Sequence, residues 1–246
     1  MKLRARTFIK MLVVILVLGS MIQLGQALAQ TGLFGGGNKI TYEQWLSSMQ
    51  VHDKFKLELE RLSQQNHSRS DLMIAYTFLF YEYGQIKELE PMVVKKESGI
   101  PWDTVFTEYL NAHEKFEPRT FDTEYLEGLT TTSRVTADDI MIADRLSFAS
   151  GEPLKTLISD KMESGQSWGD IAVELGIVNG SETLPRVQIT ADQMEQFVTD
   201  EFPEERVAEA FVLAQKVYAE PKDVVAKMKG GRSESFIMAE FWSSEF

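Results

Sequence analysis

The pentapeptide Asp-Leu-Met-Ile-Ala at residues 71–75 recurs as Asp-Ile-Met-Ile-Ala at residues 139–143. Further identical residues recur 66 to 68 positions apart, among them the pairs Gly84 and Gly151, Glu97 and Glu163, Gly99 and Gly165, and Trp102 and Trp168. Similarity at a near-constant spacing is the sequence signature of a repeat protein. The chain therefore predicts two clear copies of one unit, over residues 71–111 and 138–179.

Each copy is predicted to fold as three short helices. In the second copy, three stretches have apolar residues at helical spacing, and Gly151 and Gly165 separate them. Glycine is common after a helix because it adopts the left-handed conformation without a Cβ clash. Pro153 and Ser167 stand where the next helices would start, positions that tolerate proline and favour serine.

A weaker third copy is predicted at the C-terminus. Glu152-Pro153 reappears as Glu220-Pro221, while the tryptophan position holds Glu234. Terminal repeats are often atypical because one face meets solvent instead of a neighbouring repeat. Residues 180–246 are therefore expected to contain a connection and a degenerate third copy, with an extra helix near Thr190.

The first 29 residues have the pattern of a secretory signal peptide. A basic start precedes the unbroken apolar run at residues 11–18, and Ala27 and Ala29 supply the small residues of a cleavage site. The apolar run is shorter than the roughly 20 residues that span a bilayer. We expect export to the periplasm, cell envelope or medium, with a retained membrane anchor as the alternative.

The other predicted segments complete an all-α fold of tandem three-helix repeats. Residues 30–40 form a glycine-rich linker, and a helix over residues 41–70 begins with the capping-box spacing Thr41-x-x-Gln44. Residues 112–137 form a connection with one helical turn at 121–126. The best short strand candidate is the stretch 186–189.

Composition excludes several classes of site and partner. The chain has no cysteine, which rules out disulfides, thiolate metal sites and a cysteine nucleophile. It carries 25 basic and 37 acidic side chains, a net charge of −12. Removing residues 1–29 removes four basic residues and no acidic ones, so the mature charge becomes −16. Such a chain is repelled by phosphate backbones, which argues against nucleic acid as a partner.

The segment Ser-Trp-Gly-Asp-Ile-Ala at residues 167–172 resembles a known small module. Short helices ending in glycine, followed by such a segment, occur in tandem in exported bacterial proteins of unassigned function. The resemblance covers both clear copies and implies an architecture, but no activity or cofactor.

Residues 171–177 also resemble the first helix of a helix-turn-helix regulator. That motif requires a recognition helix to follow and enter the major groove of DNA. Here residues 178–185 contain Gly180 and Pro185 and no Lys or Arg cluster. The sequence therefore argues against this DNA-binding alternative.

Trp102 and Trp168 are the most distinctive repeated side chains. A tryptophan repeated in register, with an aliphatic residue three positions later, is typical of a core anchor; the alternative is an anchor for a partner. The repeated Asp71 and Asp139 are expected to be helix N-caps, with Asp138 as an alternative to Asp139. The three histidines lack ligand spacing and are expected to be structural or on the surface.

No catalytic, cofactor-binding or metal-binding residues are predicted. The chain matches neither the zinc-protease, the calcium-loop, the phosphate-loop nor the Gly-x-Ser-x-Gly pattern. The favoured function is binding of another protein or of an envelope component, with membrane contact only through an uncleaved signal segment. An envelope hydrolase with paired carboxylates is the alternative. Partner identity and oligomeric state do not follow from the sequence.

Overall fold

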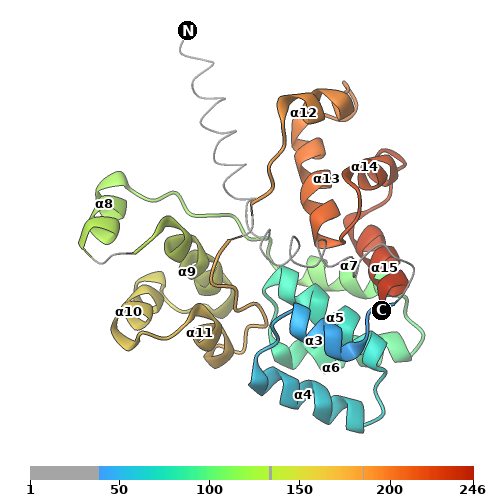
Figure 1. The fold of residues 1–246 in the computed structure, drawn as a ribbon, viewed down its shortest axis with the longest axis horizontal. Helices are drawn as coiled ribbons and strands as arrows, with labels where there is room; N and C mark the ends of the chain where they lie inside the picture. Colours follow the sequence, from blue (N-terminus) through green and yellow to red (C-terminus); the bar gives the residue numbers. More distant parts are fainter. Residues whose placement is uncertain (1–38, 133–134, 185) are drawn as a thin grey trace. The chain divides into compact units, whose positions relative to one another are not determined.

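The computed structural model describes residues 39–132, 135–184 and 186–246 (Figure 1). Regular structure in these ranges is entirely helical, with isolated β-bridges and no strand. The all-α prediction is confirmed, and the strand expected at 186–189 is wrong, since those residues have no regular structure. The predicted signal peptide, with Ala27 and Ala29, lies outside the described residues.

The described residues form two compact units, one of residues 39–183 with Phe246 and one within residues 184–245. Helices α3 to α11 belong to the first unit and α12 to α15 to the second. Within these ranges, none of the helices combines the length and the apolar character needed to cross a bilayer.

Two helices occupy the region expected to hold one N-terminal helix. Helix α3 (Tyr42–Ser48) begins with the expected capping box between Thr41 and Gln44, and α4 (Asp53–Gln64) follows after a break. The break occurs because Gln50 adopts a left-handed backbone (φ 47°) and His52 caps α4, its Nδ1 accepting the Lys54 N–H at 3.2 Å.

Helices in groups of three, here called triplets, follow along the chain. Triplet 1 contains α5 (Arg69–Glu82), α6 (Leu89–Glu97) and α7 (Trp102–Ala112), with a short 3₁₀ turn (Ile86–Glu88) before α6. Triplet 2 contains α9 (Ala137–Ser150), α10 (Leu154–Ser164) and α11 (Trp168–Glu174). Triplet 3, in the second unit, contains α13 (Glu204–Lys216), α14 (Pro221–Lys229) and α15 (Glu234–Glu245).

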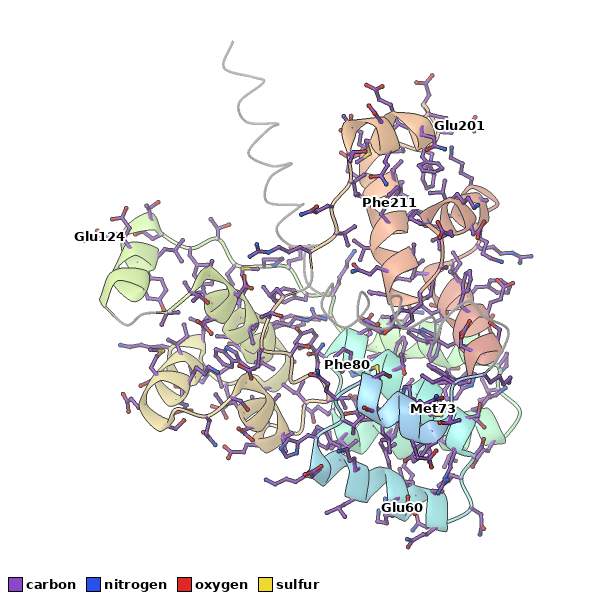
Figure 2. The ribbon with its side chains drawn as sticks, in the orientation of Figure 1. Glu60, Met73, Phe80, Glu124, Glu201 and Phe211 are labelled. Carbon is purple, nitrogen blue, oxygen red and sulfur yellow. The ribbon has the colours of Figure 1, made fainter. Side chains whose placement is uncertain are left out.

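The first helix of each triplet contributes much of its core. Residues 72–81 of α5 are all buried, among them Met73 and Phe80, which are labelled in Figure 2. Phe211 of α13 is also buried, whereas Glu60 and Glu201 are exposed. A helix buried on all sides tolerates no charged residue, and none occurs between Leu72 and Tyr81.

A left-handed glycine follows the second helix of every triplet. Gly99, Gly165 and Gly231 have φ values of 99°, 68° and 79°. Because this conformation costs a residue with a Cβ roughly 1–2 kcal/mol, glycine is strongly favoured at each position. The three stops fall where the sequence alignment predicts equivalent helix ends.

The aspartates expected to be N-caps are not the caps. Ser68 caps α5 and Thr136 caps α9, each hydroxyl accepting the N–H of the aspartate three positions later. Asp71 and Asp139 therefore occupy the third helical position. The same Ser/Thr-x-x-Asp spacing is the capping-box pattern, in which the hydroxyl residue is the cap.

The connections contain two more helices. Helix α8 (Thr123–Thr132) extends well beyond the single turn expected at 121–126, and Asp122 caps it by accepting the N–H groups of Glu124 and Tyr125. Helix α12 (Ala191–Phe197) lies where the sequence predicts an extra helix, and it begins at a capping box between Thr190 and Gln193. Between α11 and α12 the described residues form no helix, so the recognition helix of a DNA-binding motif is missing there.

We expect Gly165→Ala to destabilise the protein by about 1–2 kcal/mol, because only backbone strain opposes the added methyl group. No atom lies within 4 Å of a Cβ built at this position. Gly128, inside α8, has equally open space, and Gly128→Ala should be neutral or stabilising by up to about 1 kcal/mol. Urea unfolding of both variants provides the measurement; equal effects would contradict the strain argument.

Candidate functional site

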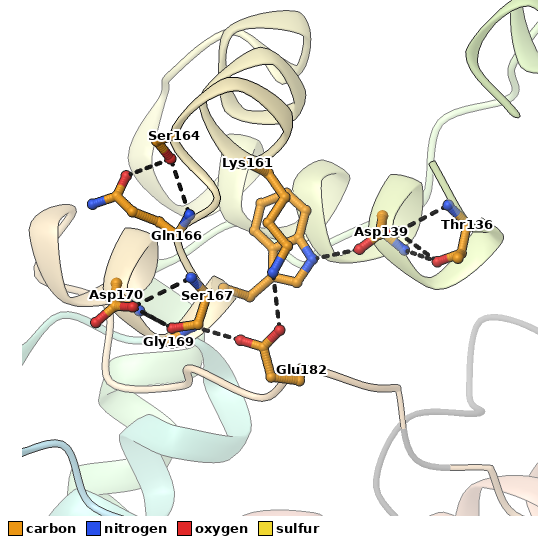
Figure 3. Close-up of polar contacts among 10 residues, drawn as sticks. Thr136, Asp139, Lys161, Ser164, Gln166, Ser167, Gly169, Asp170 and Glu182 are labelled. Carbon is orange, nitrogen blue, oxygen red and sulfur yellow. Dashed lines mark hydrogen bonds and ion pairs between the residues drawn. The ribbon is translucent and has the colours of Figure 1, made fainter. Parts of the chain in front are cut away.

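The repeated tryptophans make the same hydrogen bond in both triplets of the first unit. The Trp168 indole N–H donates to Asp139 Oδ1 at 2.8 Å (Figure 3), and the Trp102 indole N–H donates to Asp71 Oδ1 at 3.3 Å. Each tryptophan begins the third helix of its triplet, and each aspartate lies in the first turn of the first helix. The bond therefore ties the two ends of a triplet together.

Both indoles lie in the interior. Trp102 is 3% exposed and Trp168 is 0% exposed. With the indole N–H already bonded to a carboxylate, neither side chain presents a free face or donor to a partner. Their placement is that of core residues.

A lysine and a glutamate close the site over Trp168. The Lys161 ammonium lies 5.4 Å from the centroid of the Trp168 ring and 3.0 Å from Glu182 Oε2. Glu182 Oε1 accepts the Gly169 N–H at 3.1 Å (Figure 3). The amide at the start of α11 is thereby satisfied by a carboxylate from the segment that follows the helix.

The glycine after Trp168 has a steric role. A Cβ at Gly180 would lie 2.7 Å from the Cα of Gly169, and a Cβ at Gly169 would lie 3.3 Å from the Gly180 carbonyl oxygen. The first turn of α11 and the segment after it thus approach at backbone distance. This contact explains the glycine in the Ser-Trp-Gly-Asp segment.

The carboxylates of this site are held in their ionised forms. Burial by itself raises the pKa of Asp139, but hydrogen bonds from Thr136 and Trp168 outweigh it and lower the pKa below its usual value. Hydrogen bonds from Ser167 lower the pKa of Asp170. A general acid in a hydrolase needs a raised pKa, so these groups act as hydrogen-bond acceptors and not as proton donors.

The segment after α11 docks onto triplet 1. The Ile86 N–H donates to the Gly176 carbonyl at 2.8 Å, and the Val178 N–H donates to the Gly84 carbonyl at 2.9 Å. These bonds form an antiparallel bridge centred on Gln85 and Ile177. We call residues 84–86 the acceptor loop and residues 176–179 the insert.

Side chains complete this junction between the two triplets. Asn179, only 2% exposed, donates its amide to the Phe80 carbonyl at 2.9 Å. Arg145 of α9 donates to the Glu82 carbonyl at 3.1 Å, and its guanidinium lies over the rings of Tyr83 and Phe116. The last carbonyls of α5 therefore receive donors from triplet 2.

Three titratable side chains meet beside the acceptor loop. Glu88 accepts hydrogen bonds from the Gln85 N–H at 2.8 Å and from the Tyr109 hydroxyl at 3.0 Å. His113 Nε2 lies 3.0 Å from Glu88 Oε1, and its Nδ1 lies 2.8 Å from the Tyr109 carbonyl. Burial and the nearby Glu88 carboxylate raise the pKa of Tyr109. Each group is satisfied by the others, which suits a structural clamp.

Each histidine lies beside a carboxylate. Besides His113, His67 Nδ1 lies 2.8 Å from Glu97, and His52 Nε2 lies 3.6 Å from Asp170. Among the described residues, no group of three or more His, Asp or Glu side chains is placed to hold a metal ion.

Sequence reasoning missed the junction, the hydrogen-bond partner of Trp45 and the burial of Trp242. Trp45 is 1% exposed and its indole donates to the Thr77 hydroxyl, while Trp242 is fully buried and its indole donates to the Lys216 carbonyl. The helical spacing around Trp45 indicated burial, but not the partner. Asn179 is one of several polar residues in a breaker-rich stretch, so no pattern singled it out.

Comparisons with known proteins add no relative. No family model, no curated protein and no solved structure matches this chain.

Trp168→Ala is expected to lower the free energy of unfolding by about 3–5 kcal/mol, because it leaves a cavity in the core of triplet 2. Trp168→Phe keeps most of the ring but removes the indole N–H. A double-mutant cycle with Asp139→Ala, which removes the acceptor, should give a coupling of about 1.5–3 kcal/mol, typical of a hydrogen bond to a charged group. Urea unfolding of the wild type, the two single variants of the cycle and the double variant gives the coupling. A coupling near zero would contradict the role assigned to this bond.

The lowered pKa of Asp139 predicts a pH-dependent contribution to stability. For a carboxyl with a lowered folded-state pKa, the contribution is complete above the unfolded value of about 3.9 and is lost as pH falls through the folded value. The stability difference between wild type and Asp139→Asn should therefore be constant near neutral pH and shrink below about pH 4. Urea unfolding from pH 7 to pH 3 tests this; a difference that grows toward acid would refute it.

Proposed function

We propose that this chain is an exported, non-catalytic helical-repeat protein that binds another protein or a component of the cell envelope. The observation that carries the proposal is the repeated Trp–Asp bond, which joins the third helix to the first in two consecutive triplets. An active site would not need the same internal bond twice, whereas its recurrence in two consecutive triplets fits an array of like units.

Further agreement between the triplets supports a common unit. All three have the same helix order, and the left-handed glycines Gly99, Gly165 and Gly231 end the second helix of each. Arrays of helical units present extended surfaces that are suited to binding. Triplet 3 lacks the Trp–Asp pair, which fits a degenerate terminal copy.

The polar clusters favour binding over hydrolysis. The carboxylates of Asp139 and Asp170 have lowered pKa values, and Glu88 accepts bonds from the chain itself. A hydrolase with paired carboxylates would need one carboxyl with a raised pKa facing a substrate. The acidic character of the chain also makes nucleic acid an unfavourable partner.

Export rests on the sequence of residues 1–29. We expect cleavage after Ala29 in a bacterial host, detectable by the intact mass of the exported chain. Ala27→Arg together with Ala29→Arg should block cleavage, because the processing site requires small residues there. An unchanged processed mass in this variant would place the cleavage elsewhere, and no export of the wild type would overturn the proposal of an exported protein.

Binding is tested with the processed chain and purified envelope material. Co-sedimentation with cell-wall polymer, or cross-linking to an envelope protein followed by reconstitution from the two purified components, would support the proposal. The same samples are assayed for released fragments of the polymer. Release of polymer fragments without co-sedimentation of the chain would favour the hydrolase alternative over the binding function.

A further inference from the structure

The connection between triplets 1 and 2 is anchored on both sides. His113, directly after α7, is held by Glu88 and stacks on Tyr109. Phe116 contacts triplet 2, since its ring packs edge-on against Phe148 at 5.4 Å and lies under the Arg145 guanidinium. Arg119 then binds the fully buried Asp144 carboxylate, at 2.8 Å to Oδ1, and donates to Ser147 at 2.7 Å. The anchors leave only two residues between them.

Those two residues are the candidate hinge of the proposal below. Glu114 and Lys115 are exposed and lie in a stretch without regular secondary structure. His113 before them contacts triplet 1, and Phe116 and Arg119 after them contact triplet 2. Short hinges between two bodies that dock on each other are the setting in which identical chains exchange elements.

We propose that a second copy of this chain exchanges triplet 2 with the first, so that the insert of each copy docks on the acceptor loop of the other. In the exchanged dimer the bonds at Ile86, Val178 and Asn179 are the same as within one chain. Only the hinge changes conformation. The proposal does not depend on the proposed function.

The insert can dock on triplet 1 but not on the equivalent loop of triplet 2, so the exchange stops at two chains. A Cβ at Gly84 would overlap Leu79 Cδ2 and would lie 2.7 Å from the Tyr109 hydroxyl, so a larger residue there would have to displace both side chains. In triplet 2 the position equivalent to Ile86 is Pro153, which has no N–H to donate to an insert. Triplet 2 therefore offers no second acceptor of this kind, and exchange gives a closed dimer and not an open chain.

The length of the hinge sets the balance between monomer and dimer. A flexible connection keeps the insert near its own loop at an effective concentration on the order of millimolar, which favours the monomer in dilute solution. Deleting Glu114 and Lys115 brings the Cα atoms of His113 and Phe116 to 3.8 Å, so both anchors cannot be held within one chain. Inserting Gly-Ser-Gly-Ser between the two residues has the opposite effect.

The first experiment measures oligomeric state by size-exclusion chromatography with light scattering after refolding at high and low protein concentration. The deletion variant should be dimeric at all concentrations, the insertion variant monomeric, and the wild type dimeric only after concentrated refolding. Far-UV circular dichroism checks that each variant is helical. A folded, monomeric deletion variant would overturn the proposal.

The second experiment traps the junction and does not depend on the deletion variant. The native chain has no cysteine, and Gln85 and Ile177 form a non-hydrogen-bonded antiparallel pair, a spacing that allows a disulfide. Gln85→Cys and Ile177→Cys are made in separate chains, which are refolded together and oxidised. A covalent heterodimer supports exchange, and the matched pair of Lys155→Cys with Ile177→Cys should give none. If only uncross-linked chains form, while a single chain carrying both substitutions closes its own disulfide, exchange is excluded.

Discussion

Burial of tryptophan with a satisfied indole N–H is the constraint on which this fold depends. A buried indole contributes a large apolar surface, but its N–H must find an acceptor or lose a hydrogen bond. In triplets 1 and 2 the acceptor is an aspartate in the first turn of the first helix, held there by a Ser or Thr cap. One carboxylate thus supports the start of one helix and orients the start of another, which fixes how the triplet closes.

Local signals were enough to predict the fold class and several helix ends. The capping box at Thr41 and the glycine stop at Gly165 depend on neighbours within four residues, so the sequence pattern carries them. The caps assigned to the repeated aspartates were wrong because the pattern Ser/Thr-x-x-Asp holds two candidate caps. The indole N–H lies about 30 residues away in the sequence and fixes the role of the aspartate only when the chain folds.

The junction could not be predicted for a related reason. Asn179 and Phe80 are 99 residues apart, and the acceptor on Phe80 is a backbone carbonyl that any residue would supply. Gly84 has no unusual φ, so its need for glycine comes only from the Tyr109 and Leu79 side chains that fold against it. Non-local polar contacts of this kind leave no periodic signal, although they decide which surfaces of two similar triplets meet.

Triplet 3 has the same helix order as the other triplets but no tryptophan at the start of its third helix. Its third helix starts with Glu234 where the others have tryptophan, and that carboxylate lies 3.1 Å from the Lys216 ammonium at the end of α13. The buried indole of this triplet is Trp242, two turns further along α15, and it donates to the backbone carbonyl of Lys216. The caps, the proline and the left-handed glycine determine where the three helices begin and end. The tryptophan can then occupy any buried position from which its indole N–H reaches a hydrogen-bond acceptor. Triplet 3 therefore has the helix order of the other two triplets without the tryptophan at the start of its third helix.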